Sequence, residues 1–292
     1  MKTISEFIQE QETGVSLGTD NLVAAYCECA AAMSLAQCYT EQAAIIEFAV
    51  ENDVNYLNIV QEAENKENIF KRAGKAIENA WEKVLDFFRA IARKISGMIA
   101  DKRYEAITKS IKDVPSDTNL KGVASKVLTF PKFINLFNDT VEQFYQDINN
   151  DINVVSGESG AHTFKAVRAL TDFLEKNKED YGSAGPITAG AIKERFDTDF
   201  SKGRIQEVLK RLDKKIGEIE KAIKNNKKKP DKDFNAGEQS RMNEYVKKIV
   251  DLTTKGYDIA IKDFNDGYAS LKSAIDDAKK ETKSTNESFY FV

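Results

Sequence analysis

The sequence has few of the residues that interrupt helices or build catalytic and metal sites. Its 292 residues include only four prolines and fifteen glycines, and β-branched runs are scarce, so long helices are favoured over sheet. The single histidine, His162, excludes His-rich metal sites and most acid–base schemes that use histidine. Three clustered cysteines, an odd number, do not form a disulfide framework. We therefore expect an all-α, non-enzymatic protein without cofactor or metal, synthesised in a reducing cytosol.

The chain also lacks a large excess of charge of either sign. The 43 lysines and arginines nearly balance 47 aspartates and glutamates, giving a formal net charge of -4. This balance does not favour wholesale binding to nucleic acid or to an anionic membrane. The most basic run, Lys221 to Lys232, contains no aromatic residue that could stack on bases, so only weak, non-specific contact with DNA is expected from it.

The segment from Leu22 to Ala49 is rich in alanine and other small residues, and it predicts one long helix or a helix pair. A membrane-spanning helix needs about 18 to 20 apolar residues without charge. Because Glu28, Glu41 and Glu47 interrupt this segment, we expect no membrane crossing.

A stripe of small residues runs along this helix. Cys27, Ala31, Ser34 and Cys38 recur at i, i+4, i+7 and i+11, a spacing that puts them on one face and predicts close packing against another helix. A metal site made of Cys27, Cys29 and Cys38 would lack a convincing fourth ligand and the usual spacing. We therefore interpret the cysteines as packing residues.

The segment from Asn68 to Ala100 has the clearest periodicity. Two rows of mostly apolar residues, each with a spacing of seven, form one continuous seam over about four heptads. The pattern predicts a long helix in the core of a bundle. An alternative is that a basic amphipathic helix carrying Trp81, Phe87 and Phe88 lies on a membrane surface. The seam residues expected to be buried are Phe70, Ile77, Trp81, Val84, Phe88 and Ile91.

The rest of the chain predicts further helices. The run Asp113 to Asp117, which contains Pro115, ends this long helix and separates a helical hairpin over 20–112 from a C-terminal helical bundle over 113–292 with a short frayed tail. Helices are expected after Pro131 and over Ala166 to Lys178, Thr188 to Phe196, Gly203 to Asn225 and Ala236 to Lys283.

The first ten residues form a short amphipathic segment. Ile4, Phe7 and Ile8 lie on one face, and polar residues interrupt every apolar pair, so the segment is not a secretory signal. An isolated helix of this length is marginal in water. It therefore suits a docking or processing tag.

Met1-Lys2-Thr3, Glu6-Phe7-Ile8 and Glu10 resemble the capsid-targeting sequence of the internal head proteins of T-even-type tailed phages. The resemblance is confined to residues 1–12, and Ile4-Ser5 differs from the aromatic-then-polar pair of that family. It implies that residues 1–10, with Phe7 and Ile8 in targeting, carry the protein into the prohead with the scaffold or core. It also implies a virion protein of the head interior, made in the host cytoplasm, and leaves ejection into the host with DNA open.

The resemblance further implies removal of the segment by the prohead protease. In that family the cut follows a glutamate with an aliphatic residue two positions earlier, here Ile8-Gln9-Glu10, so cleavage falls before Gln11 and residues 11–19 form a linker. Other runs fit the same pattern, and four of them fall in expected helices, where a protease cannot take the backbone in extended form. These four are Ile45-Ile46-Glu47, Ala76-Ile77-Glu78, Ile192-Lys193-Glu194 and Ile205-Gln206-Glu207.

Three alternatives stay open. Residues 1–10 could be the ordinary N-terminal helix of a globular protein. The chain could instead be a membrane-active protein that hides Asn68 to Ala100 until it meets lipid, or a helical effector that binds a host protein.

Overall fold

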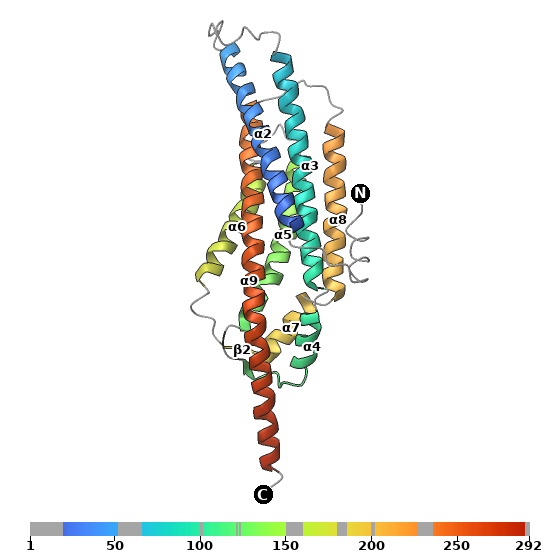
Figure 1. Cartoon of the computed structure of the whole chain (residues 1–292), viewed down its shortest axis with the longest axis vertical. Helices are drawn as coiled ribbons and strands as arrows, with labels where there is room; N and C mark the ends of the chain where they lie inside the picture. The colour runs from blue at the N-terminus through green and yellow to red at the C-terminus, as the bar shows by residue number, and fades with distance from the viewer. Residues whose placement is uncertain are drawn as a thin grey trace.

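The computed structural model describes residues 20–51, 66–99, 102–120, 122, 124–149, 160–179, 186–199, 202–226 and 236–289. Within these ranges the chain is all-α, as the composition predicts, apart from one pair of two-residue strands (Figure 1). The elements are α2 (Asp20–Glu51), α3 (Lys66–Ile99), α4 (Lys102–Ile111), β1 (Asn119–Leu120), η2 (Ala124–Leu128), α5 (Thr129–Asn149), α6 (Gly160–Glu179), β2 (Ile187–Thr188), α7 (Ala189–Asp199), α8 (Lys202–Asn226) and α9 (Ala236–Phe289).

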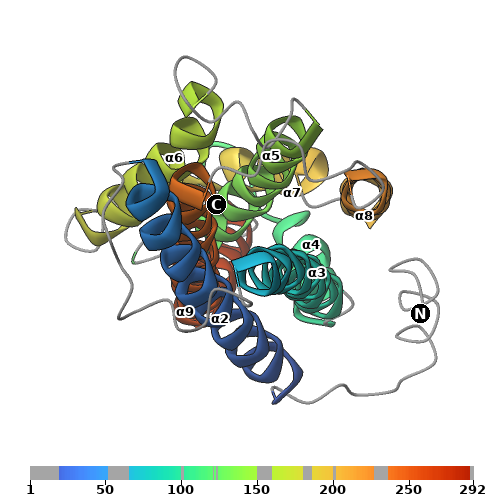
Figure 2. The same ribbon diagram turned by 90° about the horizontal axis from the view of Figure 1, so that it is seen from above.

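The long helices form an elongated bundle. Helix α9 runs along most of its length and packs against α2, α5, α6 and η2, and its C-terminal end projects beyond the other helices (Figure 1). Viewed from above, α2 lies at the edge of the bundle (Figure 2). Helix α8 packs on α3 and α5, so the later helices close the side of α3 that α2 leaves uncovered.

Helix α3 confirms the heptad prediction. Five of the six seam residues are buried, and Phe70 is half-buried. The helix packs most extensively against α2 and also against α8 and α9, because a continuous apolar seam must be covered along its whole length.

Aromatic residues fill the space between α3 and α5. The Trp81 ring stacks on Phe144 with 5.4 Å between centroids, and Phe88 meets Phe144 and Phe137 edge-on at 5.4 and 5.7 Å. All four rings are essentially excluded from solvent. Aromatic contacts of this geometry stabilise the folded state beyond the effect of the apolar area that they bury. This cluster is therefore a main source of stability.

The connection after α3 differs from the expected single helix ending near Asp113. Helix α3 ends at Ile99, and a separate helix α4 precedes a turn in which the Val114 amide donates to the Ile111 carbonyl at 3.1 Å. The chain then forms β1, which pairs with the distant β2. A Cβ at Gly190 would lie 2.8 Å from the Ser116 carbonyl oxygen, so this junction requires glycine.

Candidate functional site

Helix α2 presents an exposed row of residues along nearly its whole length. Positions on this outer face alternate in steps of three and four. The large hydrophobic side chains that the described residues expose all belong to α2: Ile45 is 54% exposed and Phe48 63% on this face, and Val23 is 63% exposed and Leu35 48% at neighbouring positions. We define the outer face of α2 as Ala24, Cys27, Ala31, Ser34, Cys38, Glu41, Ile45 and Phe48.

The predicted packing of the small-residue stripe is wrong. Cys27, Ala31, Ser34 and Cys38 are all exposed, and the residues that face the bundle come from the opposite side of the helix. Both sides of α2 are small and apolar, so the spacing of small residues could not identify the inward side. The residues that do pack inward are Cys29, Ala32, Met33, Ala36, Thr40 and Ala43.

The three cysteines do not converge. Cys29 is fully buried, whereas Cys27 and Cys38 are exposed on the outer face. Among the residues that the structure describes, no group of three His, Cys, Asp or Glu side chains is placed to hold a metal ion. The geometry therefore gives these thiols different environments.

Burial raises the pKa of the Cys29 thiol to about 12, so Cys29 stays protonated and unreactive at neutral pH. In dilute solution, we expect a thiol reagent at pH 8 to modify Cys27 and Cys38 quickly, and Cys29 only after denaturation. Because unfolded Cys29 loses its proton near the ordinary pKa of about 8.5, this thiol should also reduce stability as pH rises from that value toward 12. Peptide mass spectrometry after labelling checks the first expectation, and rapid Cys29 labelling in the native protein would contradict it.

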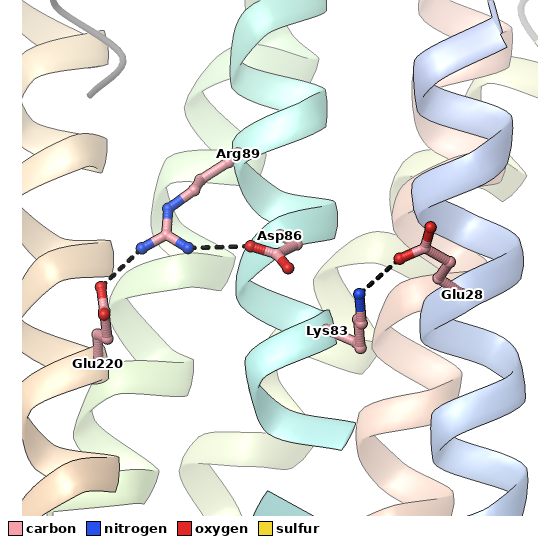
Figure 3. Close-up of polar contacts among 5 residues, drawn as sticks. All are labelled: Glu28, Lys83, Asp86, Arg89 and Glu220. Carbon is pink, nitrogen blue, oxygen red and sulfur yellow. Dashed lines mark hydrogen bonds and ion pairs between the residues drawn. The ribbon is translucent and has the colours of Figure 1, made fainter. Parts of the chain in front are cut away.

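Polar contacts join α3 to α2 on one side and to α8 on the other (Figure 3). Lys83 donates to Glu28 at 2.5 Å, and this hydrogen bond raises the pKa of the ammonium. The Arg89 guanidinium donates to Asp86 at 3.1 Å and to Glu220 at 2.8 Å. Pairs as exposed as Lys83–Glu28 contribute little to stability, but the contact neutralises a carboxylate beside the outer face.

Hydrogen bonds also hold α2 on α9. The Tyr26 hydroxyl donates to Asp251 at 2.9 Å, which raises the pKa of Tyr26. The side-chain amide of Asn243 donates to Thr40 at 3.2 Å, within a buried contact. These bonds lie on the inner side of α2, so the outer face stays presented to solvent.

The sequence-predicted site residues fall into two groups. Phe7, Ile8, Gln9, Glu10 and Gln11 lie outside the described residues, as does the lysine-rich run after Asn226. The membrane candidates Trp81, Phe87 and Phe88 lie in the core, each at most 1% exposed. Contact of these rings with a bilayer would require the bundle to open.

Val60-Gln61-Glu62 also matches the protease pattern but lies outside the described residues. The four runs that begin at Ile45, Ala76, Ile192 and Ile205 lie within helices. Their residues belong to α2, α3, α7 and α8, as predicted from the sequence. In α3, Ile77 is only 8% exposed and belongs to the main core, so extending the backbone there would disrupt packing.

One described helix, Leu22–Phe48, is long and apolar enough to span a membrane by length and composition alone. Only 28% of its most apolar stretch is buried. The sequence prediction rested on the glutamates that interrupt this helix. It missed that the other helices leave one side of it uncovered. The signal was present, because α2 has no clearly polar side.

No protein-family model matches the chain, and neither a curated protein nor a solved structure matches it.

Proposed function

We propose that this chain is a non-enzymatic internal head protein of a tailed phage. Residues 1–10 bind the prohead scaffold or core and carry the protein into the head, and the prohead protease then cuts between Glu10 and Gln11. The protein is made in the host cytoplasm and ends in the virion interior, where its contact with DNA is weak and non-specific.

The observation that carries the proposal is the contrast between the cleavage motif at Glu10 and matching motifs inside the bundle. The four motifs that end at Glu47, Glu78, Glu194 and Glu207 lie within helices of the described bundle, where hydrogen-bonded backbone resists a protease. The motif at Ile8-Gln9-Glu10 precedes that bundle and is followed by Glu12-Thr13-Gly14, a sequence with little helical preference. A chain arranged in this way supports a cut that removes the segment and spares the helices of the bundle.

The deciding experiment is terminal mass spectrometry of the protein from purified virions. We expect a mature chain that begins at Gln11. We also expect residues 1–10 fused to a foreign soluble protein to carry it into proheads, and a fusion with Phe7→Ser and Ile8→Ser to stay outside. A virion chain that still begins at residue 1 or 2, or absence of the protein from particles, would overturn the proposal.

A membrane-active function is less well supported, because it needs Trp81, Phe87 and Phe88 at the surface. Each of these rings is buried, and burial of such side chains stabilises by roughly 1.5 to 3 kcal/mol each. Leakage of liposomes caused by the folded chain would favour this alternative over the phage-head function.

A further inference from the structure

We propose that the outer face of α2 binds the same face of a second copy of this chain, forming an antiparallel, two-fold symmetric helix pair. This inference is independent of the proposed function, because it uses only residues of the described bundle.

The face is unusual in its composition. Exposed side chains of a bundle helix are normally polar, whereas this one exposes two cysteines, two alanines, a serine and two large apolar residues beside a single carboxylate. The 27 residues of Leu22–Phe48 rise about 40 Å. An apolar strip of that length on an otherwise charged protein indicates a binding surface.

The spacing of the face fits another helix. From Ala24 to Phe48 the exposed positions alternate in steps of three and four without interruption. These are the a and d positions of a coiled coil, whose side chains fit between those of a facing helix. Small residues at Cys27, Ala31 and Ser34 allow that helix to approach closely.

The face is also complementary to itself, which a two-fold interface requires. In an antiparallel pair centred at the height of residue 36, two residues lie opposite each other when their numbers add to 72. Ala24 then faces Phe48, Cys27 faces Ile45, Ala31 faces Glu41 and Ser34 faces Cys38, so every large side chain meets a small one. A shift of one heptad in one direction would place Ile45 opposite residue 20 and leave Phe48 without a described residue opposite it. The shift in the other direction would pair Phe48 with Ala31 and Ile45 with Ser34, but it would leave Ala24 and Cys27 without described residues opposite them, so the register centred at residue 36 covers most of the face.

Charge selects the antiparallel direction. Parallel helices would bring each Glu41 beside its own copy, which is repulsive. In the antiparallel pair, Glu41 of one copy lies opposite Ala31 of the other. Ala31 is about one helical turn from Glu28 of its own chain, and the charge of Glu28 is already paired with Lys83. The Lys83 ammonium is therefore close to the height at which Glu41 of the other copy arrives, a favourable arrangement of charge.

Lipid is a poorer occupant for the same face. A bilayer would surround Glu28 and Glu41 with hydrocarbon, and a carboxylate at the centre of a membrane helix is expensive. A second helix covers the apolar row, leaves Glu28 beside the seam in solvent, and places Glu41 opposite the small side chain of Ala31.

The test uses the full chain and two matched alanines. Ala31 on α2 and Ala269 on α9 are both exposed helical alanines. We expect sedimentation equilibrium to show a dimer that Ala31→Glu weakens at least about tenfold, since it sets carboxylate against Glu41. Ala31→Lys should retain or tighten the dimer, and Ala269→Glu should leave it unchanged. Circular dichroism checks that each variant keeps its helix content.

Oxidative cross-linking then identifies which residues of the two copies lie opposite each other. In a Cys27→Ser background, Ser34→Cys should cross-link to Cys38 of the second copy, as peptide mapping would show. A chain that stays monomeric at all concentrations, a dimer insensitive to Ala31→Glu, or cross-links between Cys27 and Cys38 in the unaltered chain would overturn this pairing. So would a monomer that binds phosphatidylcholine vesicles and loses that binding with Ala31→Glu, because the face would then belong to lipid.

Discussion

Replacing Trp81 with alanine is expected to lower the free energy of unfolding by about 3 to 5 kcal/mol, the range for truncating a large aromatic side chain in a core. Trp81 is 1% exposed and stacks on Phe144 between α3 and α5. Alanine removes the transfer free energy of the ring and leaves a cavity that the surrounding helices cannot close completely. Urea denaturation followed by circular dichroism measures the change.

Two further variants separate ring volume from polarity. The Trp81 Nε1–H is buried without a hydrogen-bond partner among the described residues, and such an unpaired donor is costly. Trp81→Phe keeps most of the apolar contact and removes this donor, so its loss of stability should be clearly smaller than that of Trp81→Ala.

Phe48→Ala is the control, because it also truncates an aromatic side chain to alanine, but Phe48 is 63% exposed. In dilute solution it should change stability by about 0.5 kcal/mol or less. A Trp81→Ala variant as stable as the Phe48→Ala variant would contradict the core assignment of α3.

Helix α3 could be predicted well from the sequence because the apolar pattern that specifies it lies within one segment and repeats several times. Residues such as Ile77, Val84 and Ile91 repeat a seven-residue spacing within one segment, and only a helix places them on one side. The long helix α9 was predictable for the same reason, and its residues Met242, Ile249, Phe264 and Leu271 are buried.

Features that depend on distant contacts were not predictable. Leu120 pairs with Ile187 across two strands of two residues each, too short to leave a pattern in the sequence. The break between α3 and α4 has no proline to mark it. Contacts with α3 and α9 decide which side of α2 faces the bundle. The sequence of α2 alone does not decide it, because Cys27 on one side and Cys29 on the other are equally able to pack.

Replacing Glu10 with alanine is expected to abolish processing by the prohead protease, while Glu78→Ala leaves the cut before Gln11 unchanged. Both glutamates follow an aliphatic residue by two positions, so sequence alone would treat them alike. They differ because Glu78 lies within α3 beside Ile77, a core residue. Presenting that run in extended form requires several turns of α3 to leave the bundle, at a cost of several kcal/mol.

A combined variant tests whether packing is the cause of this protection. With Glu10→Ala and Trp81→Ala together, α3 is destabilised and local opening becomes more frequent. The protease should then cut after Glu78, at a site it ignores in the chain that carries Glu10→Ala alone. Gel electrophoresis and terminal mass spectrometry of the digests identify the cut. Cleavage after Glu78 in the unaltered chain would show that the helical bundle does not protect its internal motifs, and the motif at Glu10 would then lose the selectivity on which the phage-head proposal depends.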